Sequence, residues 1–81
     1  MYLVYILQSE RDSGFYVGLT KDIDQRLKYH NAGRVRSTSK RRPFKLVYKE
    51  SFSSRVEARE REKYLKSYKG AKEKLNILRP R

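Results

Sequence analysis

Three polar side chains stand where amphipathic helices would otherwise bury apolar ones. Two of them, Arg26 and His30, are four residues apart, so on a helix they share one face and can bind the same anion. The simpler alternative places both at the margin of the buried face, with the charged head of Arg26 in water and His30 bonded to a backbone carbonyl. This segment alone supports both interpretations equally.

Glu62 is the third residue of this kind, because it falls inside the apolar stripe that contains Ala58 and Leu65. An ion pair with Lys66, one helical turn later, would account for it without any function. The alternative is a carboxylate that binds a metal ion and faces the amino-terminal part of the chain. The chain has no cysteine and one histidine, which excludes metal sites built from cysteine or histidine clusters.

Two tyrosines precede these residues in segments that are typical of strands. Residues 1–20 hold two runs of β-branched and aromatic residues, YLVYIL and FYVGL, joined by a polar connector, and this pattern predicts a hairpin. Tyr5 and Tyr16 taken alone would be ordinary core residues. Gly18 shares a face with Tyr16, and a glycine inside a strand often marks the close approach of a ligand. Together with the three polar helix residues, this pattern favours the hairpin as the floor of a cleft, with Gly18 leaving room for a phosphate.

The segments between these residues predict the elements that position them. Asp22 can cap a helix that extends to Asn31, with Gly33 as its stop. Alternation after Pro43 predicts a third strand that begins at Phe44.

A second long helix is predicted by the capping box at Ser54–Glu57. We expect it to extend to about Tyr68 or Lys69, with Gly70 as its stop, and to be followed by at most a short helix. Residues 79–81 should fray as a terminal tail.

The charge of the chain indicates a polyanionic partner. There are 21 Lys and Arg against 9 Asp and Glu, a net charge of +12. Membrane-surface helices need a wide apolar face, and the helices expected here have narrow, mixed ones. We therefore expect nucleic acid as the partner and no membrane.

The basic charge is densest in a loop, residues 33–43, that we expect to be mobile in the free protein and to order on binding. Its cations and that of the next strand are candidate phosphate contacts: Arg34, Arg36, Lys40, Arg41, Arg42 and Lys45. The hydroxyls of Ser37, Thr38 and Ser39 could add hydrogen bonds to phosphates.

Length and cysteine content bound the remaining expectations. Eighty-one residues suit a single domain, residues 1–81. The absence of cysteine fits a reducing compartment, and the first apolar run lacks the basic start and the length of a signal peptide. We therefore expect a cytoplasmic protein.

Taken in order, four groups of residues resemble the motifs of the GIY-YIG nuclease domain: Val4-Tyr5-Ile6, Tyr16-Val17-Gly18, Arg26 with His30, and Glu57-Ala58 followed by Glu62. The resemblance is closest to the small stand-alone branch that is called endo/excinuclease amino-terminal-domain-like, which also has counterparts of VYILQS, RRP and REKYLK. It extends from Tyr2 to about Leu78.

This resemblance implies an α+β fold, in which helices flank a three-stranded antiparallel sheet in the order β-β-α-β-α, with a further helix. The strands and helices expected above have the same order. It also implies an endonuclease that hydrolyses DNA phosphodiester bonds with one divalent cation, Mg²⁺ or Mn²⁺, in DNA repair or recombination. The alternative is a basic nucleic-acid-binding module whose nuclease-like site is inactive without a partner protein that supplies substrate specificity. RNA stays open as a substrate.

Roles for individual residues also come from the resemblance. Tyr5 is the candidate base that acts on water, Tyr16 a donor to a phosphate oxygen, and Glu62 the metal ligand. Arg26 would bind the scissile phosphate with its planar fork. His30 either orients or deprotonates Tyr5 or contacts phosphate, and the sequence leaves this open, as it does whether Asn76 belongs to the site.

Overall fold

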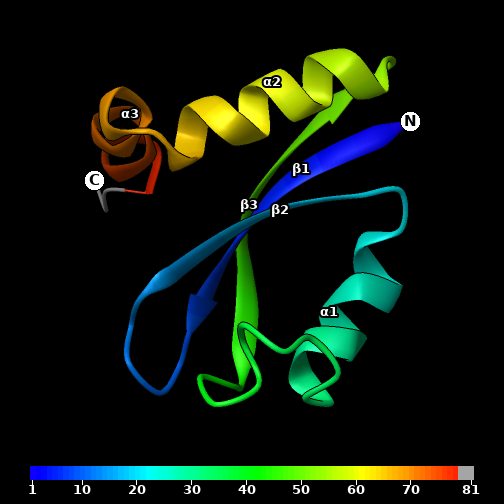
Figure 1. Ribbon diagram of the computed structural model, residues 1–81. Helices are drawn as coiled ribbons and strands as arrows, with labels where there is room; N and C mark the ends of the chain where they lie inside the picture. Colours follow the sequence, from blue (N-terminus) through cyan, green and yellow to red (C-terminus); the bar gives the residue numbers. More distant parts are fainter. Residues whose placement is uncertain (79–81) are drawn as a thin grey trace.

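A three-stranded antiparallel sheet with helices on both faces forms the protein (Figure 1). The structure is a computed structural model and describes residues 1–78. Its elements are β1 (Tyr2–Ser9), β2 (Phe15–Thr20), α1 (Ile23–Asn31), β3 (Phe44–Phe52), α2 (Arg55–Lys66) and α3 (Tyr68–Leu78). The sheet order is β2-β1-β3, so the first strand is central. The predicted α+β fold and its order of elements are confirmed.

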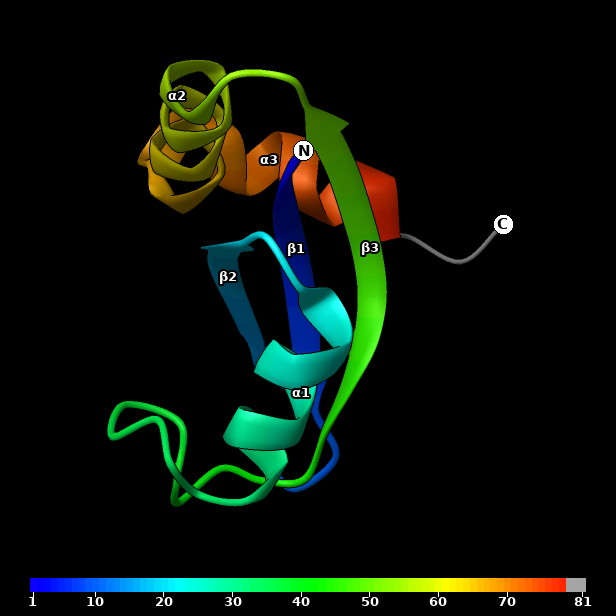
Figure 2. The same cartoon turned by 90° about the vertical axis from the view of Figure 1, so that its right-hand side faces the viewer.

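The two faces of the sheet are covered by different helices, α1 on one and α2 with α3 on the other (Figure 2). The face toward α2 buries mainly aliphatic side chains: Val4, Ile6, Val17, Ala58 and Leu65. The face toward α1 buries Tyr5, Leu7 and Phe44, packed against Tyr16, Ile23, Leu27 and Leu46. Because successive strand residues alternate between faces, both candidate tyrosines of the hairpin point toward α1.

The pairing of β3 with β1 is interrupted by a bulge. Leu7 pairs with Leu46 whereas Ile6 pairs with Tyr48, so Val47 is an extra residue in β3. Leu46 therefore packs on the α1 face and Tyr48 on the α2 face. The uniform alternation that predicted this strand is wrong at that point.

Both predicted helix starts are confirmed by their capping bonds. The Asp22 carboxylate accepts from the Gln25 N–H at 3.1 Å, and the Ser54 hydroxyl oxygen accepts from the Glu57 N–H at 3.3 Å. Helix α1 ends as expected just before Gly33, whose φ of +78° is a left-handed conformation that favours glycine.

The predicted end of the second helix is wrong. Helix α2 ends at Lys66, and Gly70 lies inside α3, which extends for 11 residues. A Cβ at Gly70 would lie 1.7 Å from the Tyr64 carbonyl oxygen, so this glycine is needed for α3 to approach the last turn of α2. Gly70, which the sequence suggested as a helix stop, is therefore required by the close contact between α2 and α3.

An ionic cluster fastens α3 to the rest of the fold. The Arg61 guanidinium lies 2.7 Å from Glu50 of β3 and 2.9 Å from Glu73 of α3. These bonds join three elements on the face away from α1, and the guanidinium holds the pKa of Glu73 below its ordinary value.

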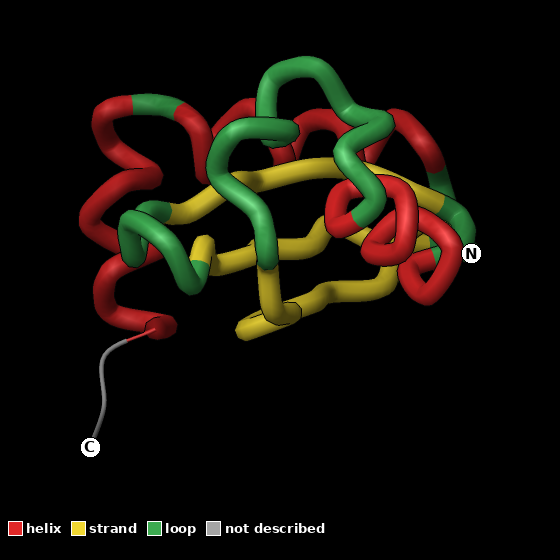
Figure 3. The backbone as a smooth tube through the Cα atoms, turned by 90° about the horizontal axis from the view of Figure 1, so that it is seen from below, coloured by secondary structure: helices red, strands yellow, loops and turns green. Residues whose placement is uncertain are grey.

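The β1–β2 turn and the loop between α1 and β3 lie at the same end of the sheet, as Figure 3 shows from below. No helix within residues 1–78 has the length and apolar character needed to cross a membrane. The predicted frayed tail, residues 79–81, lies outside the described residues.

Candidate active site

A chain of hydrogen bonds joins β1, α1 and the loop that precedes β3. The Tyr5 hydroxyl lies 3.0 Å from His30 Nε2, and His30 Nδ1 lies 2.8 Å from the Thr38 hydroxyl. The Thr38 hydroxyl lies in turn 3.3 Å from the carbonyl oxygen of Val35. Tyr5, His30 and Thr38 are all fully buried. The structure thus places the predicted residues Tyr5 and His30 in direct contact. It also shows that the hydroxyl of a third residue, Thr38, contacts His30.

The direction of the protons follows from the need of each buried donor for an acceptor. Thr38 donates its one hydroxyl proton to the Val35 carbonyl, so its oxygen accepts from Nδ1–H of His30. His30 Nε2 then carries no proton and accepts from the Tyr5 hydroxyl. In the opposite tautomer Tyr5 would accept from both His30 and Arg26, and its own hydroxyl proton would lose the His30 acceptor. With the proton of His30 on Nδ1, every buried donor of this network has an acceptor.

Burial shifts both titrating partners toward their neutral forms. Burial and the nearby Arg26 charge lower the pKa of His30 to about 4, so the imidazole is neutral at pH 7. Burial raises the pKa of Tyr5, against the opposing effect of its hydrogen bond from Arg26. A neutral imidazole that accepts from a neutral phenol is the form expected of an unused acid–base pair.

Arg26 and Tyr16 complete the cluster on this face. Arg26 Nε donates to the Tyr5 hydroxyl at 3.4 Å, and the bond raises the pKa of Arg26. A guanidinium has five N–H donors, so this contact leaves others for a phosphate. The Tyr16 ring lies edge-on to His30, with centroids 4.9 Å apart, and 6.4 Å from the Tyr5 ring. Four of the five predicted catalytic residues therefore lie in one cluster.

Glu62, the fifth, comes from α2 on the other face of the sheet and is linked to the cluster through its charge. Its carboxylate contributes to the raised pKa of Tyr5, although burial is the larger cause. It also forms the ion pair with Lys66 that the sequence offered as the simpler explanation, at 3.0 Å, with 18% of its side chain exposed. Glu62 is thus paired with Lys66, and its charge also affects the pKa of Tyr5.

Glu62 is a single carboxylate, the type of ligand that a hard divalent cation prefers, and here it is paired with Lys66. Within residues 1–78 no three His, Cys, Asp or Glu side chains gather into a metal-ligand cluster. Mg²⁺ keeps several of its waters and needs only one or two protein carboxylates when a phosphate supplies further ligands. Binding of Mg²⁺ or Mn²⁺ by Glu62 together with substrate therefore stays a prediction.

Gly18 does not leave room for a phosphate, which corrects that expectation. A Cβ at Gly18 would lie 2.3 Å from the Tyr5 hydroxyl oxygen and 2.4 Å from its ring carbon Cζ. Tyr5 thus fills the space above Gly18, its partner across the β1–β2 pair. Gly18 is needed because any larger residue would collide with the Tyr5 side chain. The glycine that we interpreted as a mark of ligand approach instead marks the close approach of this side chain.

The basic loop is folded down onto the β1–β2 turn and is not a detached segment. Ser9 Oγ donates to the Arg41 carbonyl oxygen at 2.5 Å, and Arg11 donates to that of Lys40 at 3.1 Å. The Arg41 guanidinium pairs with Asp12 at 2.8 Å and holds the pKa of that carboxyl at about 2. Arg41 is therefore engaged within the protein.

The other predicted phosphate contacts of this region are all exposed: Arg34, Arg36, Lys40, Arg42 and Lys45. Thr38 is the exception among the loop hydroxyls, because it is fully buried against His30. Nothing in a serine- and basic-rich loop distinguishes Thr38 from its neighbours, so sequence reasoning missed its role.

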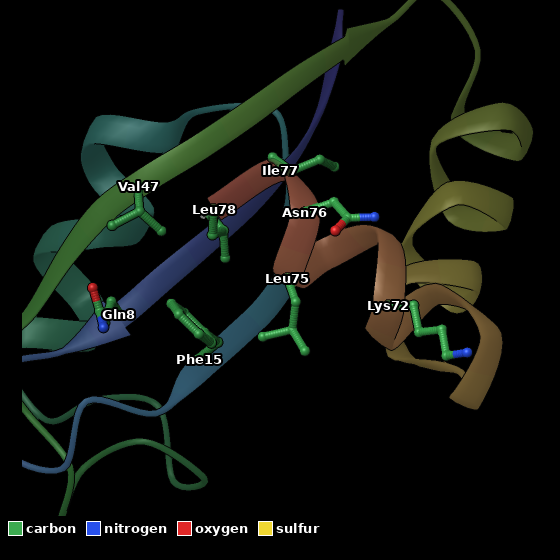
Figure 4. A pocket seen from close by; sticks show the side chains of 8 residues that line it. All are labelled: Gln8, Phe15, Val47, Lys72, Leu75, Asn76, Ile77 and Leu78. Atoms are coloured by element: carbon green, nitrogen blue, oxygen red, sulfur yellow. The ribbon is translucent and has the colours of Figure 1, made fainter. Parts of the chain in front are cut away.

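Asn76 lies away from this cluster. It lines a pocket between α3 and the α2-side face of the sheet with apolar neighbours that include Phe15, Leu75 and Leu78 (Figure 4). Tyr5 and Tyr16 pack on the opposite face, so Asn76 is not part of their cluster.

Comparison with known proteins identifies the family. The model of the GIY-YIG catalytic domain matches residues 1–76. A UPF0213 protein of Staphylococcus haemolyticus is 38% identical over 81 residues, which are 99% of this chain and 96% of that protein. The UPF0213 protein YazA of Bacillus subtilis is 40% identical over 68 residues, which are 83% of this chain and 69% of that protein.

A solved structure agrees with these matches. The solution NMR structure of a UPF0213 protein from Bacillus halodurans is 38% identical and superimposes with a TM-score of 0.57. The match covers 98% of this chain and 86% of that one. The names of these relatives state no activity. The chain therefore belongs to the GIY-YIG nuclease family, as its motifs predicted.

Proposed function

We propose that this protein is an endonuclease that hydrolyses DNA phosphodiester bonds with one divalent cation, Mg²⁺ or Mn²⁺. The observation that carries the proposal is the hydrogen-bonded chain of Tyr5, His30 and Thr38 with Arg26 against the same phenol. A core tyrosine needs one partner for its hydroxyl, whereas this one has a base on one side and a cation on the other. That arrangement suits proton transfer beside an anion.

The side chains act as follows. A water attacks the phosphorus and gives its proton to the Tyr5 oxygen, while the Tyr5 proton passes to His30 Nε2. Arg26 binds the phosphate and stabilises the phenolate character of Tyr5 as the proton leaves. Tyr16, beside His30, donates to a phosphate oxygen. Glu62 would hold the divalent cation, which would supply positive charge to stabilise the leaving 3′ oxygen.

The exposed loop cations support DNA as the substrate. Neutralised phosphates release counterions, so binding through Arg34, Arg36 and Lys40 should weaken steeply as salt rises. A role in DNA repair or recombination and a cytoplasmic location are parts of this proposal that derive from the family resemblance and from the absence of cysteine.

The test is nicking of supercoiled plasmid with Mg²⁺ or Mn²⁺, comparing wild type, Glu62→Ala and Glu60→Ala. Glu60 is an exposed acid of the same helix, so its replacement matches the loss of charge without removing the metal ligand. Wild type and Glu60→Ala should nick, and Glu62→Ala and samples with EDTA should not. Equal nicking by all three proteins would indicate a contaminating nuclease and reject the proposal.

A second candidate is a DNA-binding module that is inactive until a partner opens its site. It is favoured by the full burial of Tyr5, which a water must reach for hydrolysis. Salt-sensitive DNA binding without hydrolysis of duplex, nicked, branched or single-stranded DNA or of RNA would select this alternative.

A further inference from the structure

Thr38 connects the basic loop, residues 33–43, to the buried hydrogen bonds of His30 and Tyr5. The loop's outer surface carries Arg36 and Lys40, two residues to either side of Thr38, and both are exposed. Thr38 itself is fully buried, and its hydroxyl bonds His30 Nδ1 at 2.8 Å. A loop that served only to contact phosphates would have no need to bury a hydroxyl against a histidine.

The backbone of the loop holds this threonine in place. The Thr38 N–H donates to the Val35 carbonyl at 3.1 Å, and the Arg41 N–H donates to the Thr38 carbonyl at 2.9 Å. The Thr38 hydroxyl donates to the same Val35 carbonyl. When the hydroxyl proton is used in that bond, the oxygen lone pairs of Thr38 face His30, and the hydroxyl is an acceptor there.

We propose that Thr38 is a positioning residue, which holds the proton of His30 on Nδ1 so that Nε2 is free to accept the proton of Tyr5. The inference rests on the proposed function for its catalytic meaning, although the tautomer itself can be measured without any reaction. Without the Thr38 oxygen, a neutral imidazole in this pocket gains by turning its proton to Nε2, where the Tyr5 oxygen can accept it. Tyr5 would then have no base.

The position of Thr38 links substrate contact to this proton path. Arg36 and Lys40, which are expected to contact phosphates, belong to the same short segment that presents the Thr38 hydroxyl. The loop must therefore lie in its folded position, against Ser9 and Asp12, for His30 to be ready as a base. In this proposal residues 36–40 both contact the phosphate backbone and determine which ring nitrogen of His30 carries the proton.

The test uses the fact that His30 is the single histidine of the chain. Two-bond ¹H–¹⁵N NMR spectra of uniformly ¹⁵N-labelled protein at pH 7 report which ring nitrogen carries the proton, with no ambiguity of assignment. Wild type should show the Nδ1–H form. Thr38→Val, which keeps the shape and removes the hydroxyl, should shift the ring toward Nε2–H. Thr38→Ser should restore Nδ1–H, and Ser37→Ala, an exposed hydroxyl of the same loop, should leave it unchanged.

Several outcomes would overturn the inference. An Nε2–H signal in wild type rejects it without any variant, so it stays testable even if Thr38→Val fails to fold. Nδ1–H retained in folded Thr38→Val also rejects it. The plasmid assay provides a separate readout, in which Thr38→Val should nick roughly 100-fold more slowly and Thr38→Ser close to wild type, as for loss of an acid–base partner.

The two proposals fail separately in these experiments. If wild type shows Nδ1–H and the variants shift as stated while no protein nicks any DNA, the positioning role stands and the endonuclease proposal fails. If wild type nicks and Thr38→Val nicks equally well, the positioning role fails and the endonuclease proposal stands.

Discussion

The Tyr5 hydroxyl lies 3.0 Å from His30 Nε2, so an imidazole from α1 contacts a phenol from β1. In the free protein the shifts of both groups oppose transfer, because burial raises the pKa of Tyr5 and lowers that of His30. Without substrate, Tyr5 and His30 therefore both stay neutral. A phosphate and a cation beside Tyr5 would change this balance, since positive charge favours a phenolate.

Tyr5→Phe should abolish nicking with only a moderate loss of stability. The loss of an acid–base group slows reactions by about 10²–10⁴-fold. The vacant Nε2 of His30 should cost about 1–3 kcal/mol, because a buried acceptor loses its donor. Nicking rates and urea unfolding measure the two effects. Tyr2→Phe, on the same strand, is the matched control, and a Tyr5→Phe protein that nicks at the wild-type rate would remove Tyr5 from the mechanism.

Stability should fall as the pH falls below about 6.5, because of His30. Its pKa is about 4 in the folded protein against an ordinary 6.5, so between these values the unfolded chain binds a proton that the folded protein does not. A shift of one unit corresponds to about 1.36 kcal/mol, so the loss between pH 7 and 4.5 should be roughly 2–3 kcal/mol. Urea unfolding at half-unit pH steps measures it.

The window above pH 4.5 isolates this effect from the carboxyls. The pKa values of Asp12 and Glu73 are lowered from 3.8 and 4.5, so the stability that these carboxyls contribute is lost mainly below pH 4.5, as the unfolded carboxyls bind protons. His30→Gln should therefore show a nearly flat stability profile between pH 7 and 4.5. A profile as steep as that of wild type would mean that another group is responsible.

The sequence predicts the fold well where local chemistry and tertiary packing agree. Both helix caps, Asp22 and Ser54, are backbone signals that act within one turn, and both were found where expected. Gly70 was misinterpreted because the contact that requires it, with the Tyr64 carbonyl, exists only after α3 packs on α2. The bulge at Val47 was missed for the same reason, since register depends on the partner strand.

The same limit applies to the site. Arg26 and His30 were detectable because they break an apolar period, which is a local signal. Gly18 broke its strand pattern too, but the sequence does not say that Tyr5 fills the space above it. Thr38 broke no pattern at all, since a loop has no period against which a buried hydroxyl would stand out. Function is thus easier to predict for helix and strand residues than for the loop that supports them.

Lys66→Ala should strengthen metal binding while it removes an ion pair. The Lys66 ammonium lies 3.0 Å from the Glu62 carboxylate and competes with a cation for it. Half-exposed pairs of this kind contribute about 0.2–1 kcal/mol, so affinity for Mn²⁺ should rise about two- to fivefold. Titration followed by Mn²⁺ electron paramagnetic resonance measures this without DNA. Glu62→Gln should lose binding, and unchanged affinity in Lys66→Ala would show that Mn²⁺ binds elsewhere.

Gly18→Ala should displace Tyr5 and impair nicking, although the change adds a single methyl group. The new Cβ would lie 2.3 Å from the Tyr5 hydroxyl oxygen, in a fully buried site that cannot relax toward solvent. Overpacking of this kind typically costs about 1–3 kcal/mol, so unfolding should shift together with the nicking rate.

Gly14→Ala is the matched control, because the nearest atom to its Cβ is the flexible end of Arg41, at 2.5 Å, which can move aside. It should nick like wild type and change stability little. If Gly18→Ala also behaves like wild type, then Tyr5 tolerates displacement, and the hydrogen bond to His30 cannot be the part of the site on which hydrolysis depends. Loss of nicking in Gly18→Ala alone would tie activity to the seat of this one phenol.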